Sequence, residues 1–165
     1  MFTTIEGFVS EWNQEYQITL NVMNALTDAS LSQAIRGDRR TLGGLAWHLV
    51  ESLGYMSQCG LSYEGPAKDE AIRQSAAAIA EEYRKLGERM VQAVQTQWKD
   101  EDLARTQMLF GEEWQNGATL RFTVMHQVHH RGQMTVLMSQ AGLRVPDVYG
   151  PTYDTWVERG MTPLV

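Results

Sequence analysis

Little in this sequence suits secretion, a membrane or nucleic acid. Its one cysteine, Cys59, cannot form a disulfide within the chain, and the N-terminus lacks the basic and apolar regions of a signal peptide. No run approaches the ~18 apolar residues of a membrane span. The net charge of −6 at pH 7 argues against nucleic acid, whose binding needs a concentrated basic surface. We therefore expect a cytoplasmic protein that binds neither membranes nor nucleic acid.

The sequence also lacks the marks of disorder and of several enzyme classes. It contains no low-complexity tract, no Gly-x-Ser-x-Gly elbow of serine hydrolases and no phosphate-binding glycine loop. With 165 residues, 43% apolar and 21% charged, the chain can bury a sizeable core. We expect one domain over residues 1–165.

Apolar residues recur at steps of three and four in four segments, which is the period of a helix with one buried face. The pattern predicts helices over residues 3–26, 42–59, 69–98 and 119–141. Residues 106–110 suggest a short strand or an extended turn, and the proline- and glycine-containing tail from residue 144 to 165 is expected to be irregular. The predicted fold is all-α, a four-helix bundle with an irregular C-terminal tail.

The fourth predicted helix is apolar on two faces. Leu120 and Val124 lie on one side, whereas Phe122, Met125 and Val136 lie on nearly the opposite side. Such a helix needs two packing partners. The bundle core supplies one, and a second subunit is the other that we expect, so the chain is predicted to form a homodimer.

Three of the four histidines lie within five residues, on the fourth predicted helix. His126 and His130 are four residues apart, so they point the same way. His48, on the second predicted helix, could add a third imidazole across the bundle. Catalytic zinc sites use three protein ligands and leave a fourth position for water. His48, His126 and His130 are therefore the candidate ligands of an open metal site.

Other roles for these histidines remain open. His48 could be a partly buried histidine that bonds a carbonyl group, and His126 with His130 could face solvent or a subunit interface. His129 points about 80° away from that pair, at ~100° per residue. We expect it to serve an interface or to support a ligand rather than to bind the metal itself.

Few further residues are candidates for chemistry. Glu51, one turn after His48, and Arg131, next to His130, are weak catalytic candidates, although a solvated carboxylate is the plainer interpretation of Glu51. Arg131 and Gln133 could hold a substrate carboxylate or orient a ligand, and a structural role is an equal alternative for both. Cys59 follows His48 by eleven residues, about 16 Å along a continuous helix, too far to share a site with it.

Three motifs resemble those of the DinB/YfiT-like family of metalloenzymes. The stretch Thr41-Leu-Gly-Gly-Leu-Ala-Trp-His48 is similar to the segment that carries the family's first histidine. The stretch His126-Gln-Val-His-His-Arg-Gly-Gln133 resembles its His-x-x-x-His-Arg-Gly-Gln signature, and Val145-Pro-Asp-Val-Tyr-Gly-Pro151 resembles its C-terminal tail. The resemblance covers nearly the whole chain.

That resemblance implies a four-helix bundle, often dimeric, with nickel or zinc bound by His48, His126 and His130 and by water. Some members transfer low-molecular-weight thiols to electrophiles, or isomerise maleylpyruvate with a thiol cofactor. We therefore expect a metal-dependent enzyme of thiol S-transferase or hydrolase type that acts on a small molecule. The alternatives are a non-catalytic, metal-binding homodimer and a stress protein that binds a small hydrophobic ligand.

Overall fold

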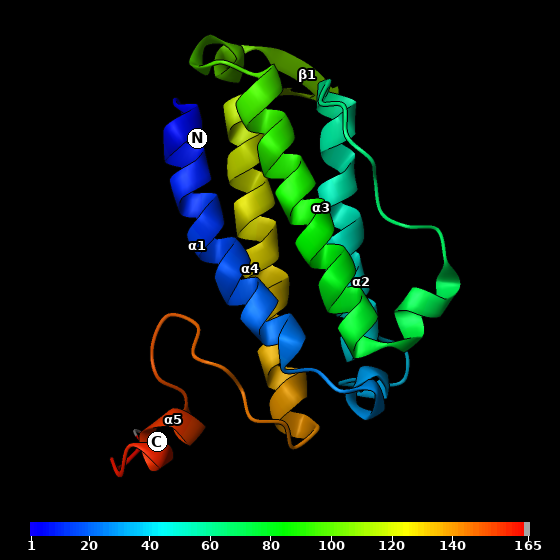
Figure 1. Cartoon of the computed structure of the whole chain (residues 1–165), viewed down its shortest axis with the longest axis vertical. Coiled ribbons are helices and arrows are strands. Elements are labelled where there is room, and N and C mark those ends of the chain that lie inside the picture. The colour runs from blue at the N-terminus through cyan, green and yellow to red at the C-terminus, as the bar shows by residue number, and fades with distance from the viewer. Residues whose placement is uncertain (164–165) are drawn as a thin grey trace.

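Four long helices run alongside one another and enclose the core (Figure 1). They are α1 (Ile5–Asn24), α2 (Leu42–Leu53), α3 (Ala76–Gln97) and α4 (Asn116–Gln140) in this computed structural model, which describes residues 1–163. Both α1 and α2 pack against both α3 and α4. The prediction of an all-α four-helix bundle is confirmed. Residues 164 and 165 of the predicted tail lie outside the described part of the chain.

The predicted apolar stripes form the core. Each helix turns its stripe inward because burial of apolar surface is the main favourable contribution to folding. On α1 and α3 the stripe includes aromatic rings that stack across the helix pair, with Tyr16 lying between Trp12 and Tyr83. The stripe residues that are fully or nearly fully buried are Phe8, Trp12, Leu20, Met23, Leu45, Leu49, Leu53, Met56, Ala76, Ile79, Tyr83, Leu86, Met90, Ala93, Leu120, Val124 and Met138.

Two helix boundaries differ from the prediction. The helix predicted over 42–59 ends at Leu53 and continues as a separate 3₁₀ helix, because Gly54 weakens the helix and the ring of Pro66 packs where its side chain would stand. The helix predicted over 69–98 begins at Ala76, since Ser75 caps it. The 3₁₀ helices of the chain span Asp28–Ser32, Gly54–Cys59, Glu70–Gln74 and Asp100–Ala104.

A two-stranded hairpin closes one end of the bundle (Figure 1). Strands β1 (Thr106–Leu109) and β2 (Glu112–Gln115) pair antiparallel, so the first of the two alternatives for residues 106–110 is right. Phe110 and Gly111 both have positive φ, 54° and 83°, which gives the turn the twist that a two-residue hairpin needs.

The hairpin also covers part of the second apolar face of α4. Phe122 contacts the rings of Tyr55, Phe110 and Trp114. This part of the face is therefore partly covered by the chain itself, whereas Met125 and Val136 remain half exposed, at 56% and 51%.

The C-terminal tail is less irregular than predicted. It contains the short helix α5 (Tyr153–Glu158), which Thr152 caps by accepting a hydrogen bond from the amide of Thr155. The rest of the described tail has no regular structure. Throughout residues 1–163, no helix has the length and apolar character that crossing a membrane would require.

The close approach of α1 and α3 gives a stability prediction. A Cβ at Gly87 would lie 2.5 Å from Cε2 of Tyr16, whose hydroxyl is tied to the carbonyl of Arg84. We expect Gly87→Ala to lower the free energy of unfolding by about 1–2 kcal/mol, because overpacking outweighs the gain in helix propensity. Urea denaturation followed by circular dichroism measures this change.

Gly132→Ala is the matched control. Gly132 is also helical, but nothing lies within 4 Å of the position its Cβ would take. This substitution should raise stability by up to about 1 kcal/mol. A Gly87→Ala protein as stable as the wild type would show that α1 and α3 do not meet this closely.

Candidate metal centre

The site forms where α2 and α4 pack side by side. His48 comes from α2, and His126 and His130 come from successive turns of α4. A buried amide fixes the register of the two helices, since Nε2 of Gln127 donates to the carbonyl of Leu49 and to the hydroxyl of Ser52. Gln127 and Leu49 each directly follow a histidine of the site, so this contact sets how far apart the rings lie.

The three imidazoles meet through their Nε2 atoms. Nε2 of His126 lies 3.3 Å from Nε2 of His48 and 3.2 Å from Nε2 of His130. One nitrogen from each ring lies within 4.8 Å of those of the other two. Three bonds of ~2.0–2.1 Å to one ion at tetrahedral angles would place ligand nitrogens about 3.3–3.4 Å apart. Two of the three nitrogen separations therefore match those of a three-histidine metal site, and the third lies within 4.8 Å.

Hydrogen bonds alone do not account for this arrangement. In a neutral imidazole, each ring nitrogen is either a donor or an acceptor. Nε2 of His126 therefore makes one well-aligned hydrogen bond, but it has two nitrogen neighbours at bonding distance. A shared cation would use the lone pairs of all three rings. His48, His126 and His130 are thus brought together as predicted, and they could hold a metal ion.

Burial keeps the rings uncharged. Burial is the main cause that lowers the pKa of His126 to about 4, and the neighbouring His130 and His48 lower it further. The pKa values of His48 and His130 are also lowered, mainly by burial, with a further contribution from the charge of Arg40. Neutral imidazole is the form that binds metals, so the cluster is ready to accept an ion at pH 7.

Gln133 orients the His130 ring, a role that the sequence suggested for it. The Nδ1 atom of His130 donates to Oε1 of Gln133 at 2.7 Å, which leaves the lone pair on Nε2, toward the cluster. Nε2 of Gln133 donates in turn to Nε2 of His129, 3.2 Å away. His129 therefore stands outside the cluster and supports it through Gln133, in line with the supporting role expected for it.

The His126 ring has a different environment. Its Nδ1 atom is buried and has no hydrogen-bond partner in residues 1–163. Phe122 packs against the ring, with centroids 5.7 Å apart. Packing against Phe122, rather than a hydrogen bond, therefore holds the His126 ring in place.

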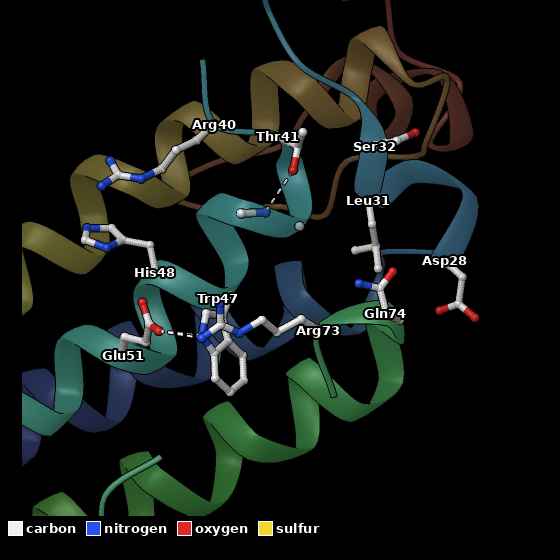
Figure 2. A pocket seen from close by; sticks show the side chains of 12 residues that line it. Asp28, Leu31, Ser32, Arg40, Thr41, Trp47, His48, Glu51, Arg73 and Gln74 are labelled. Carbon is white, nitrogen blue, oxygen red and sulfur yellow. Dashed lines mark hydrogen bonds and ion pairs between the residues drawn. The ribbon is translucent and has the colours of Figure 1, made fainter. Parts of the chain in front are cut away.

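A cavity of about 500 Å³ adjoins the cluster on the α2 side (Figure 2). Its charged lining residues are Asp28, Arg40, Glu51 and Arg73, and His48 also lines it. Oε1 of Glu51 accepts hydrogen bonds from Nε1 of Trp47 and from Arg73, at 2.7 and 3.0 Å. Glu51 is thus a half-exposed carboxylate beside the candidate site, not a member of the histidine cluster.

Arg131 has structural contacts. Its guanidinium group is 1% exposed and donates to the carboxylate and main-chain carbonyl of Glu15, the hydroxyl of Thr19 and the hydroxyl of Tyr149. These bonds tie α4 to α1 and to the C-terminal tail. With its donors directed at these groups, Arg131 is placed as a clamp between elements.

Cys59 is buried at the end of the 3₁₀ helix that follows α2, and burial raises the pKa of its thiol. A raised pKa disfavours the reactive thiolate. It does not belong to the group of residues that could hold a metal, although the continuous helix that the spacing argument assumed ends at Leu53.

Comparisons with known proteins agree with the motifs. The model of the DinB family matches residues 1–161. The chain belongs to the DinB family. The uncharacterized protein YrdA of Bacillus subtilis is 43% identical over 162 residues, which cover 98% of this chain and 97% of YrdA. The family resemblance inferred from the motifs is therefore confirmed.

Two solved structures of DinB-like proteins support the fold. One from Bacillus cereus is 46% identical, with a TM-score of 0.85, and the match covers 90% of this chain and 100% of that chain. YjoA of Bacillus subtilis is 17% identical, with a TM-score of 0.67, and the match covers 88% and 99% of the two chains. At that identity YjoA supports the DinB fold alone.

The histidine cluster gives a pH prediction for the metal-free protein. In the unfolded chain a histidine has a pKa of about 6.5, whereas that of folded His126 is about 4. Between these values the unfolded state binds more protons, so the free energy of unfolding should fall as the pH drops from 7 to 5. Urea midpoints of chelator-treated protein measure the slope.

Two variants test the origin of that slope. His126→Gln removes the most shifted ring and should flatten the dependence between pH 7 and pH 5. His129→Gln changes a histidine outside the cluster and should leave most of it in place. Equal slopes in the wild type and in His126→Gln would contradict the burial of neutral rings.

Proposed function

We propose that this DinB-family protein binds a divalent transition metal, nickel or zinc, through His48, His126 and His130. We further propose that it is a metal-dependent enzyme of the thiol S-transferase or hydrolase type, acting on a small molecule. The observation that supports the proposal is the meeting of three neutral imidazoles through Nε2, with N–N distances of 3.2 and 3.3 Å. The open cavity beside His48 supports catalysis over a purely structural site.

An ion at this position would lower the pKa of a thiol or a water molecule that binds it. The chain's own residues have three further tasks in this proposal. The three rings would hold the ion and would leave a position for the thiol or the water. Gln133 keeps the lone pair of His130 on Nε2. The cavity admits a small molecule next to His48.

Glu51 is a carboxylate of the cavity wall, one turn after His48 on α2, that could take up a proton. Both of its hydrogen bonds use Oε1, so Oε2 has no hydrogen-bond partner within the described residues. Its place in the cavity wall puts this carboxylate within the space that a substrate would enter (Figure 2). We propose Glu51 as a proton acceptor for the thiol or the water, and Arg131 as a structural residue.

Metal binding tests the core of the proposal. Isothermal titration with Ni²⁺ and Zn²⁺ should give one ion per chain, and His130→Ala should lose measurable binding because two histidines remain. Gln133→Ala should weaken binding by about tenfold, since it removes the partner that orients His130. His129→Ala should bind within a few-fold of the wild type.

A screen of thiols against electrophiles then tests catalysis. Turnover should require the added ion and should disappear in His130→Ala. Failure of the wild-type protein to bind either ion would refute the metal centre. Tight binding with no turnover of any pair would favour the second candidate, a non-catalytic metal-binding bundle.

We also propose that the chain forms a homodimer through the outer face of α4. The hairpin partly covers Phe122, but Met125 and Val136 stay exposed on the same helix. Met125→Glu should shift the mass measured by light scattering from two chains to one, because it places a charge in an apolar contact. Gln140→Glu, an exposed change near the end of α4, should not. A wild-type protein that is monomeric at high concentration would contradict the proposal.

A further inference from the structure

One cation of the cavity has no counter-charge. Arg40 and Arg73 are the two arginines in its wall. Arg73 lies 3.0 Å from a carboxylate oxygen of Glu51, and its guanidinium group stacks on the ring of Trp47 with 4.9 Å to the centroid. Arg40, by contrast, makes no ion pair and no side-chain hydrogen bond within residues 1–163. It is exposed, and its five N–H donors are free.

The backbone holds Arg40 beside the histidine cluster. The next residue, Thr41, forms an isolated β-bridge with Ala34 and caps α2. The amide of Leu42 donates to the carbonyl of Gln33 at 2.7 Å. From this fixed position the guanidinium group of Arg40 reaches toward the His48 ring (Figure 2). Its charge acts on all three rings of the cluster.

Arg40 also connects two cavities. Besides the cavity next to His48, it lines a second one of about 450 Å³, whose wall includes Gln133 and the ion pair of Asp38 and Arg39. Gln133 is the residue that orients His130. A molecule held by Arg40 can therefore extend along either side of the candidate metal centre.

We propose that Arg40 binds a carboxylate of the substrate and so selects anionic small molecules for the three-histidine site. This inference rests on the proposed function, because it places the reacting atom of the substrate at the histidine cluster. The rings are neutral and offer Arg40 no counter-charge, and a bound divalent ion would add positive charge next to it. Of the two carboxylates in the cavity wall, that of Glu51 is already paired with Arg73, and that of Asp28 accepts a hydrogen bond from the amide of Ala76 at 2.7 Å and forms no ion pair with Arg40. A carboxylate on the incoming molecule would supply the missing charge with two parallel hydrogen bonds.

The carboxylate could belong to the thiol or to the molecule that the thiol attacks. In the first case Arg40 and the ion would hold the two ends of one thiol. In the second case Arg40 would hold the partner molecule while the thiol occupies the open position. Both arrangements use the same chemistry at Arg40, so the experiment needs one arm for each.

The first arm compares three thiols of similar size on Ni²⁺-loaded protein: 3-mercaptopropionate, which is anionic, 2-mercaptoethanol, which is neutral, and cysteamine, which is cationic. Calorimetry should show that the wild type binds 3-mercaptopropionate about tenfold more tightly than 2-mercaptoethanol, and cysteamine most weakly. Arg40→Met should lose this preference and keep its affinity for 2-mercaptoethanol. Arg40→Lys should restore part of it, because lysine keeps the charge but not the paired donors.

The second arm saturates the loaded protein with 2-mercaptoethanol and titrates succinate, which carries carboxylates but no thiol. Binding that requires Arg40 would assign the subsite to the partner molecule. The same succinate titration on metal-free protein measures carboxylate binding by Arg40 even if no ion binds. A protein that binds no metal can therefore be told apart from one whose Arg40 binds no carboxylate.

Arg36→Met is the matched control for both arms. Arg36 is a nearby exposed arginine, but it pairs with Asp38 at 2.6 Å and lines neither the cavity next to His48 nor the second cavity. It should behave as the wild type does. Charge selectivity in either arm that Arg40→Met abolishes and Arg36→Met retains supports the subsite. No selectivity in either arm, or an equal loss in both variants, overturns it.

Discussion

The register between α2 and α4 is the constraint on which the candidate site depends. His48 and His126 are 78 residues apart in sequence, yet their Nε2 atoms lie 3.3 Å apart. A metal site tolerates deviations of a few tenths of an ångström in its ligand–metal distances, whereas sliding one helix along the other by one turn moves a ring by ~5.4 Å. The buried amide of Gln127 bonds to α2 between the level of His48 and the end of the helix. This buried polar contact allows one register, since a shifted helix would leave it unsatisfied.

Three faces of α4 have three different roles. One face packs Leu120, Val124 and Met138 into the core. Another directs Arg131 at α1 and the tail, and a third presents the histidines to α2. Burying the Arg131 guanidinium is costly unless its donors are satisfied, and four acceptors from α1 and the tail meet this need. The clamp fixes the rotation of α4, and so the direction of its histidines.

In our proposal, the charges around the histidine cluster make the site selective for anions. The chain as a whole carries a net charge of −6, which by itself would repel anions. Around the histidine cluster the balance differs, because the rings are neutral, Arg73 is paired with Glu51 and Arg40 is unpaired. Local charge acts over the few ångströms of the cavity, whereas the net charge of the surface is screened beyond ~8–10 Å. An anion can therefore be favoured at the centre of an acidic protein.

The sequence by itself determined the four helices, their buried stripes, the pairing of His126 with His130 on one face and the family. All of these follow from periodicity along one helix or from contiguous motifs. The tertiary structure decided the rest: that the Nε2 atom of His48 faces that of His126, that Gln133 joins His129 to His130, and that Arg131 is a clamp while Arg40 stays unpaired. The physical reason is that a pattern along one helix fixes which way a side chain points around its own axis. It does not fix the shift and rotation of one helix against another, which depend on contacts between residues far apart in the chain.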